Sequence, residues 1–365
     1  ARRYMDVYPG GEWYDALTLT AGQMYAGETN WTEVIRHFSE VLQVKPGHQA
    51  AAECLYLLGY AHFMEEQFEQ TRVRMLDLQR RFPESDLMDD ALYWSAMAAI
   101  FAGDFSTGAR EFEDLLKRFP DTLYGIDAAY RLGVCHYALG DFDRAEQQLA
   151  TFQLKHPDHA LAPEAQMTRG DIAGAVGRID DAIRHYQAAM NAPTNNLNIE
   201  QFNHCAFQAG QILYDHERYA DLRAHFQRYL AMEREESNPP LAIYWIGRAM
   251  WQMNEHNGAV RFYRDAAIKY GRDRLAVGVD MILDEWVAAT RKLSPDEAAV
   301  AWKDIEMTIR AARDSGDRVA QLRFQRLLLY HPDLKPSGRE RLLDLICTSS
   351  NIPYASPAVL ETMLA

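Results

Sequence analysis

Five prolines recur in the first half of the chain at a constant spacing of 37 residues. They are Pro9, Pro46, Pro83, Pro120 and Pro157, and each one ends an amphipathic stretch. A fixed period of this size indicates stacked supersecondary units, because each unit can bury its apolar face only against its neighbours. The spacing therefore predicts a repeat array, although a length of 365 residues alone would also allow two or three globular domains.

Each unit repeats one template of residue types, in which a first helix carries a small residue and an aromatic or branched residue opens a second helix. The openings are Trp31, Phe68, Phe105, Phe142, Ile179 and Tyr219. The close-packing glycines are Gly59, Gly133, Gly170, Gly210 and Gly247, and the large inner residues include Met75, Phe112, Leu149, Tyr186, Phe226 and Tyr263. Two helices approach closely only where small residues meet, and large residues then fill the space toward the next pair. The proline stops the second helix because it cannot donate to the helix ladder.

This pattern resembles the tetratricopeptide repeat. The resemblance rests on a G-x-x-(Y/F/H) motif, the turn Gly140-Asp141-Phe142, Ala145 and the terminal Pro157. It implies an all-α fold, a right-handed α-solenoid of antiparallel helix pairs, with seven repeats over residues 14–271. In the same frame, residues 1–13 are expected to be the tail of a truncated preceding repeat, so the chain would be a fragment that also stops inside a helix at Ala365.

Beyond Gly271 the repeat signature fades while the helical periodicity persists. Ser294 followed by Pro295 and two acidic residues is a strong helix start, which predicts a helix to about Arg313. Further helices are expected over 275–291, 317–330 and 337–347, and from Ser356 onward. Residues 272–365 are therefore predicted to be a helical continuation or cap of the solenoid.

The repeats are about three residues longer than the 34-residue norm of the family. Long repeats with endings such as R-F-P-E-S and K-R-F-P-D-T, around Pro83 and Pro120, are similar to those of bacterial envelope proteins. Examples are the outer-membrane β-barrel assembly lipoprotein and the Tol-Pal coordination factor. The resemblance implies a periplasmic or cell-envelope location, with a cytoplasmic location open as the alternative.

Charge and motifs argue against several classes of function. The formal charge is −14 and the basic residues are scattered, so no basic stripe exists to neutralise nucleic-acid phosphates. No stretch reaches the roughly 20 apolar residues of a membrane span. Nucleotide-binding, serine-hydrolase and zincin motifs are missing, so we expect no enzyme and no cofactor. His156 and His159 provide too few ligands for a metal site, and the four widely spaced cysteines are expected to be buried small hydrophobes.

In the family, the first helices line a concave groove, which implies a partner-binding surface here. Acidic residues recur at the second template position of these helices, and aromatic residues recur at the fifth, sixth and twelfth. The expected groove residues are Glu53, Tyr56, Asp90, Tyr93, Trp94, Asp127, Tyr130, Tyr137, Glu164, Phe207, Tyr214, Tyr244, Trp245 and Trp251. An acidic row beside aromatic ring faces suits a partner segment that carries Lys or Arg.

These observations favour a non-catalytic scaffold that binds a protein or peptide partner in an acidic, aromatic-lined groove. Two other interpretations stay open. The array could be a docking or regulatory arm of a larger enzyme or envelope assembly whose active part lies outside this chain, or its exposed repeat ends could mediate self-association.

Overall fold

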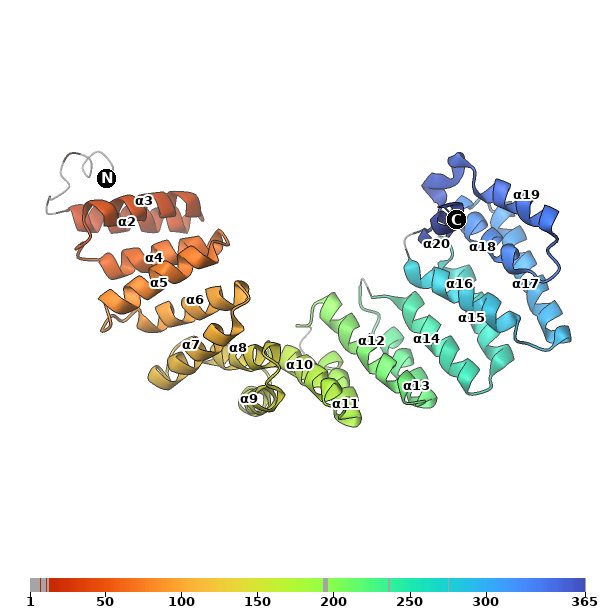
Figure 1. The fold of residues 1–365 in the computed structure, drawn as a ribbon, viewed down its shortest axis with the longest axis horizontal. Helices are drawn as coiled ribbons and strands as arrows, with labels where there is room; N and C mark the ends of the chain where they lie inside the picture. Colours follow the sequence, from red (N-terminus) through yellow and green to blue (C-terminus); the bar gives the residue numbers. More distant parts are fainter. Residues whose placement is uncertain are drawn as a thin grey trace. The chain divides into compact units, whose positions relative to one another are not determined.

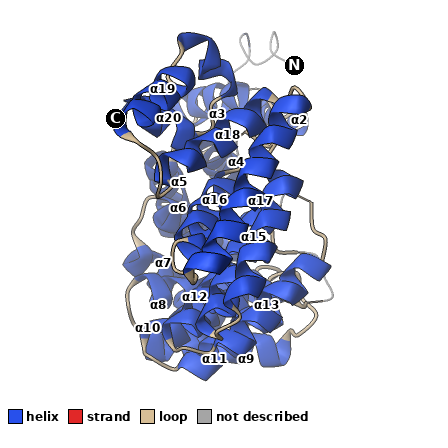
Figure 2. Cartoon of the chain, turned by 90° about the vertical axis from the view of Figure 1, so that its right-hand side faces the viewer, coloured by secondary structure: helices blue, strands red, loops and turns tan. Residues whose placement is uncertain are grey.

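The computed structural model describes residues 13–192, 196–235, 237–274 and 276–364, together with Val7 and Gly11. Over these residues all regular secondary structure is helical, and most consecutive helices pack against one another (Figures 1 and 2). The all-α class predicted from the sequence is therefore confirmed. The predicted truncated tail with Pro9 lies almost wholly outside the described residues.

The helix pairs follow the predicted period. The first helices of the pairs are α2 (Tyr14–Gly27), α4 (Ala51–Met64), α6 (Met88–Phe101), α8 (Gly125–Ala138), α10 (Ala162–Ala175), α12 (Ile199–Asp215) and α14 (Pro239–Gln252). The second helices are α3 (Trp31–Val44), α5 (Phe68–Arg81), α7 (Phe105–Arg118), α9 (Phe142–Lys155), α11 (Ile179–Met190), α13 (Tyr219–Ala231) and α15 (His256–Tyr270). Up to α13, every second helix begins at the residue that the sequence template indicates.

The C-terminal helices also match the sequence signals. They are α16 (Val277–Thr290), α17 (Pro295–Asp314), α18 (Arg318–Leu327), α19 (Pro336–Ile346) and α20 (Pro357–Leu364), with 3-10 turns at Leu328–Tyr330 and Ser349–Tyr354. Ser294 is the N-cap of α17, as the sequence predicts, and it forms a capping box with Glu297. The helical nature of this region is thus confirmed.

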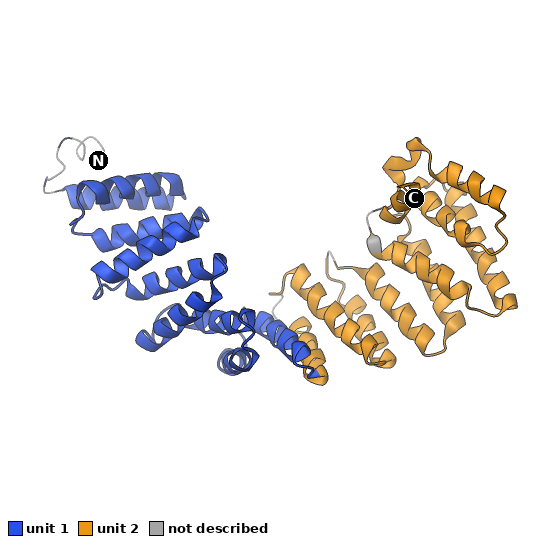
Figure 3. Ribbon diagram, viewed as in Figure 1, with its two compact units in different colours: residues 1–178 blue, residues 179–365 orange. Residues whose placement is uncertain are grey.

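The chain divides into two compact units, residues 1–178 and 179–365 (Figure 3). We call them the N-terminal unit and the C-terminal unit, and each is described by itself. The N-terminal unit contains α2 to α10, and its first helices lie beside one another, as α4 does beside α6. The C-terminal unit contains α11 to α20.

Close glycine contacts hold the two helices of a pair together. A Cβ added to Gly210 of α12 would lie 2.4 Å from Cζ of Phe226 in α13, and one added to Gly59 would lie 2.8 Å from Cε of Met75. Phe226 and Met75 are fully buried. The predicted role of small residues in the first helix is therefore confirmed, because any side chain at these glycines would occupy space that the large residue fills.

One buried arginine anchors the last helices of the C-terminal unit. Arg323 of α18 has no solvent exposure and donates hydrogen bonds to the carbonyls of Gly271, Asp273 and Arg274, at 3.2, 2.5 and 3.0 Å. Its Nε lies 2.9 Å from Oδ1 of Asp280 in α16. Asp280 also accepts a hydrogen bond of 3.1 Å from the hydroxyl of Ser356, next to α20. The ion pair thus joins α16 to α18, and the hydrogen bond from Ser356 connects the start of α20 to the same carboxylate.

The cysteine prediction is partly wrong. Cys54, Cys135 and Cys205 are buried free thiols, whereas Cys347 is exposed. Cys347 directly follows the last residue of α19, and its thiol lies 3.9 Å from the carbonyl oxygen of Thr362 in α20. Burial raises the pKa of the Cys54 and Cys135 thiols to about 12, which keeps them protonated at neutral pH.

Candidate functional site

Acidic residues of the N-terminal unit bind tyrosines of the preceding repeat. The Tyr93 hydroxyl donates to Oδ2 of Asp127 at 2.6 Å, and the Tyr130 hydroxyl donates to Oε2 of Glu164 at 3.0 Å. Each pair is 34 residues apart and links the first helices of successive repeats. The hydrogen bonds hold both carboxylates in place, and they raise the pKa of the two phenols further after burial has raised it.

Asp90 belongs to the same row but has a different donor. The hydroxyl of Tyr124, in the turn before α8, donates to Oδ1 of Asp90 at 2.6 Å. The Tyr124 ring stacks on Tyr93 with centroids 4.0 Å apart. Burial raises the pKa of Asp90, and the hydrogen bond from Tyr124 opposes that shift. Sequence reasoning missed Tyr124, although the same 34-residue separation relates it to Asp90.

The tyrosine rings themselves are not open to a partner. Tyr93 and Tyr130 are each 7% exposed and pack in core clusters of the repeats, and Tyr244 of the C-terminal unit is 8% exposed. The expectation that their ring faces line a groove beside the acids is corrected, because these rings fill the space between helices. Only the hydroxyl groups of Tyr93 and Tyr130 contact the acidic residues, whereas the Tyr244 hydroxyl accepts a hydrogen bond from Arg248.

Charge along this row is partly compensated. Arg131, one turn after Asp127 in α8, forms an ion pair with that carboxylate, and both side chains are 28% exposed. Asp90 and Glu164 are half-buried, and Glu53 of α4 is exposed. We name Glu53, Asp90, Asp127 and Glu164 the acidic row. One arginine against four carboxylates leaves the row negative.

Aromatic contacts surround the N-terminal end of the row. The Trp94 ring contacts Tyr60 and Phe63 of the preceding first helix edge to face, at centroid distances of 4.8 and 4.9 Å. Tyr56 stacks on Tyr60 at 6.2 Å, and burial raises the pKa of Tyr56 to about 12. Tyr60, which the predicted site omits, therefore joins Tyr56 to Trp94.

Tyr137, a further predicted aromatic residue of the N-terminal unit, lies apart from this cluster. It is half-buried near the end of α8, and its ring centroid is 6.1 Å from that of Phe142, the first residue of α9. Burial is the larger cause that raises the pKa of Tyr137, and the nearby carboxylate of Asp171 adds to it. This ring therefore covers the turn within one helix pair.

The predicted aromatic residues of the C-terminal unit surround a cation. Arg248 of α14 donates hydrogen bonds to the hydroxyls of Tyr214 and Tyr244, at 2.6 and 2.8 Å. Its guanidinium carbon lies 4.4 Å from the ring centroid of Tyr214 and 5.6 Å from that of Trp245. Desolvation lowers the pKa of Arg248, but the Tyr244 hydrogen bond and nearby negative groups raise it overall.

A small pocket of about 90 Å³ opens beside Arg248. Its wall includes Trp251, Glu285 and Lys292, and Glu285 lies 4.0 Å from Nε of Arg248. Phe207, the remaining predicted residue, instead packs on Phe226 and Tyr229 at centroid distances of 5.5 Å each. The first helices of the two units thus differ in chemistry. Those of the N-terminal unit carry carboxylates, whereas in the C-terminal unit Arg248 of α14 is surrounded by Tyr214, Tyr244 and Trp245.

Neither a metal-binding cluster nor a membrane-spanning helix occurs among the described residues. That part of the chain holds no group of three or more His, Cys, Asp or Glu residues placed to bind a metal ion. None of its helices combines the length and the apolar character that crossing a bilayer requires.

Several solved structures are similar to this chain. YrrB, described as a TPR protein with an unusual peptide-binding site, is 13% identical, with 53% of this chain and 93% of YrrB covered and a TM-score of 0.44. A tetratricopeptide repeat protein from Parabacteroides merdae is 12% identical, with 74% and 98% covered and a TM-score of 0.47. The apo form of RapI is 14% identical, with 81% and 86% covered and a TM-score of 0.45.

No curated protein matches the sequence. Residues 42–204, a little under half of the chain, match the family described as the tetratricopeptide repeat-like domain. Within that segment the helix pairs α4–α5, α6–α7 and α8–α9 keep the period of 37 residues that their first residues define. The family match and the helix pairs together show that residues 42–204 form tetratricopeptide-like repeats.

Proposed function

We propose that this chain is a non-catalytic scaffold that binds a basic segment of a partner protein along the acidic row of the N-terminal unit. The observation that carries the proposal is the fixing of Asp127 and Glu164 by tyrosine hydroxyls of the preceding repeats. Carboxylates held in this way lose little side-chain entropy when a partner binds, so more of the interaction energy remains for affinity.

Charge supports the choice of partner. Each half-buried carboxylate accepts one tyrosine hydrogen bond and retains further lone pairs for a lysine or arginine. Rim ion pairs contribute about 0.2–1 kcal/mol each and are screened by salt, so several must act together. A partner with regularly spaced basic residues meets this condition, since successive carboxylates lie on successive first helices.

Location and wider assembly are part of the same proposal. A periplasmic or cell-envelope setting is supported by the long repeats and their R-F-P endings around Pro83 and Pro120. A docking role within a larger assembly would use the same acidic row, so the binding test below applies to it as well.

The test measures binding of a fluorescent Lys- and Arg-rich peptide to the full chain. The double variant Asp90→Asn with Glu164→Gln removes two charges, while each amide oxygen can still accept the tyrosine hydrogen bond. We expect about a tenfold loss of affinity, because two charge-assisted contacts of roughly 0.7 kcal/mol each disappear. Raising the salt concentration should weaken binding to the wild-type chain more than to the variant.

The matched control removes two charges from second helices of the same unit. Glu69 of α5 and Asp143 of α9 are exposed, so Glu69→Gln with Asp143→Asn changes the net charge equally. This control should leave affinity within about twofold of wild type. Equal losses in both double variants would reduce the effect to net charge and refute the site, and absence of peptide binding by the wild-type chain would refute the function.

A further inference from the structure

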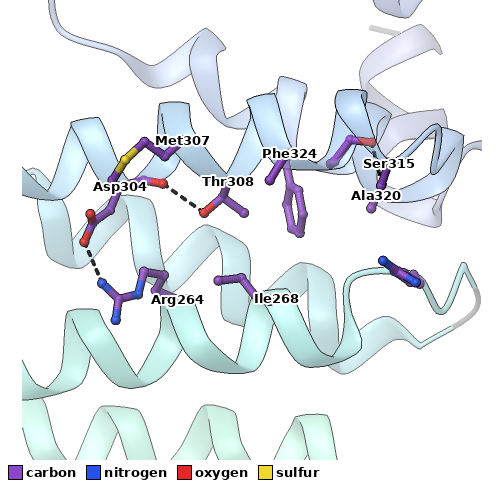
Figure 4. A pocket seen from close by; sticks show the side chains of 11 residues that line it. Arg264, Ile268, Asp304, Met307, Thr308, Ser315, Ala320 and Phe324 are labelled. Atoms are coloured by element: carbon purple, nitrogen blue, oxygen red, sulfur yellow. Dashed lines mark hydrogen bonds and ion pairs between the residues drawn. The ribbon is translucent and has the colours of Figure 1, made fainter.

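A pocket of about 370 Å³ lies between α15, α17 and α18 in the C-terminal unit. Arg264, Ile268 and Arg272 form one wall, at intervals of four residues along and just beyond α15. Figure 4 shows Phe324 of α18 extending into the space that Ile268 borders. The pocket is formed by α15, α17, α18 and the residues that follow α15 and α17, and it shares no residue with the acidic row or with the surroundings of Arg248.

Small residues create this pocket at the end of the repeat array. Ala311 and Ala312 of α17, Ser315 directly after this helix and Ala320 of α18 contribute only small side chains to the wall. Ala311 and Ala312 lie in the last turn of α17, which has 20 residues and is longer than any second helix of the repeats. Side chains of this size leave unfilled the volume that larger apolar residues would occupy.

Polar groups of the wall are satisfied by the protein itself. Thr308 donates to the Asp304 carbonyl at 2.8 Å, and Ser315 donates to the Ala312 carbonyl at 2.9 Å. The Arg264 and Asp304 side chains form an ion pair of 2.8 Å that borders one part of the pocket in Figure 4. The pocket is open to solvent, since Ile268 and Met307 are each more than half exposed, and its surface is mainly apolar, with Phe324 buried at its wall.

Arg272 supplies a positive charge that favours a ligand with a carboxylate group. Its side chain is 72% exposed, and its Nε lies 3.2 Å from Asp317. A guanidinium has five N–H donors in a planar fork, so the group can bind a second carboxylate while it keeps Asp317. An apolar pocket with a cationic group at its wall is suited to a ligand that has an apolar body and a carboxylate.

We propose that this pocket binds a small amphipathic carboxylate, such as a medium-chain fatty acid, with its apolar chain against Ile268 and Phe324 and its carboxylate at Arg272. Pockets of about 300–1,000 Å³ with apolar linings and few polar groups are typical of small-molecule sites.

The test is calorimetric titration of the full chain with sodium octanoate and, in parallel, with uncharged 1-octanol. Ala311→Leu fills the pocket from an exposed position and should weaken binding of both compounds at least tenfold. Arg272→Gln should weaken octanoate by about threefold to fivefold, as expected for an exposed ion pair, and leave octanol unchanged. Ala188→Leu, at an exposed alanine of α11, is the control and should bind like wild type.

Melting temperatures of the three variants confirm that each is folded before affinities are compared. Absence of octanoate binding below roughly 1 mM would overturn the proposal, because the apolar contact would then contribute too little free energy for a site. Unchanged affinity in Ala311→Leu would place the ligand elsewhere, and equal losses of octanoate and octanol in Arg272→Gln would refute the role of the carboxylate.

Discussion

His225 provides a sharp test of how buried histidines couple the C-terminal unit to pH. Its side chain is 2% exposed, and Nε2 lies 2.8 Å from the carbonyl oxygen of Ala206 in the partner helix α12. Desolvation lowers the pKa of His225 from 6.5 to about 4, because a buried imidazolium loses its hydration. The folded protein therefore holds this histidine neutral at every pH above about 4.

The sign of the pH effect follows from this lowered pKa. The contribution of neutral His225 to the free energy of unfolding is present in full well above pH 6.5 and is lost as the pH falls toward 4. The reason is that the unfolded chain binds a proton at this histidine in that range and the folded chain does not. The two pKa values give a loss of about 2 kcal/mol at pH 5. For a unit of this size, that corresponds to roughly 4–8 °C in melting temperature.

The substitution His225→Gln isolates the effect. Gln148, at the same position of α9, donates from Nε2 to the carbonyl of Ala129 at 3.2 Å, so glutamine can make this bond without titrating. We expect the variant to melt within a few degrees of wild type at pH 8. At pH 5 the variant should have gained roughly 4–8 °C relative to wild type.

Circular dichroism melts of both proteins from pH 5 to pH 8 provide the measurement. The difference between the two melting temperatures cancels the titration of all other groups, including the lowered pKa of His48 and His62. A difference that does not change with pH would refute the reasoning, because it would mean that His225 has the same pKa in both states.

Two further substitutions test the packing of the C-terminal unit. Asp280→Ala leaves Arg323 buried without its carboxylate and should destabilise the unit by about 3–5 kcal/mol, measured by urea unfolding; a loss below about 1 kcal/mol would contradict the anchoring role. Gly210→Ala places a methyl group 2.4 Å from Phe226 and should cost about 1–3 kcal/mol in the same assay, whereas Gly47→Ala, with no atom within 4 Å of the added Cβ, should be nearly neutral. Equal effects of the two glycine substitutions would contradict the role of close packing at Gly210.

The periodic pattern was sufficient to predict the helices. A proline two residues after α3, α5, α7 and α9 ends each of these helices locally. Asn30, Asp104 and Asp141 cap the starts of α3, α7 and α9 through their own side chains. Caps and breakers act within a few residues of chain, so sequence alone determines these boundaries. The same locality explains why the helix start at Ser294 was predictable beyond the repeats.

The candidate site was only partly predictable. The period places Asp90, Asp127 and Glu164 at equivalent positions of successive first helices, and it does so without knowledge of the packing. It does not reveal that Tyr93 reaches Asp127, or that Tyr124 reaches Asp90 from a turn. These contacts depend on the distance between neighbouring helix pairs, which the summed packing of both repeats determines.

Sequence by itself determined the repeat period, the helix boundaries and the identity of the acidic row, because each follows from local chemistry and from its regular recurrence. Only the tertiary structure decided which aromatic rings are buried, that Arg248 is enclosed by Tyr214 and Tyr244, and that a pocket opens beside Phe324. Burial and cavity volume depend on whether side chains distant in sequence fill the same space, and no local pattern records that outcome.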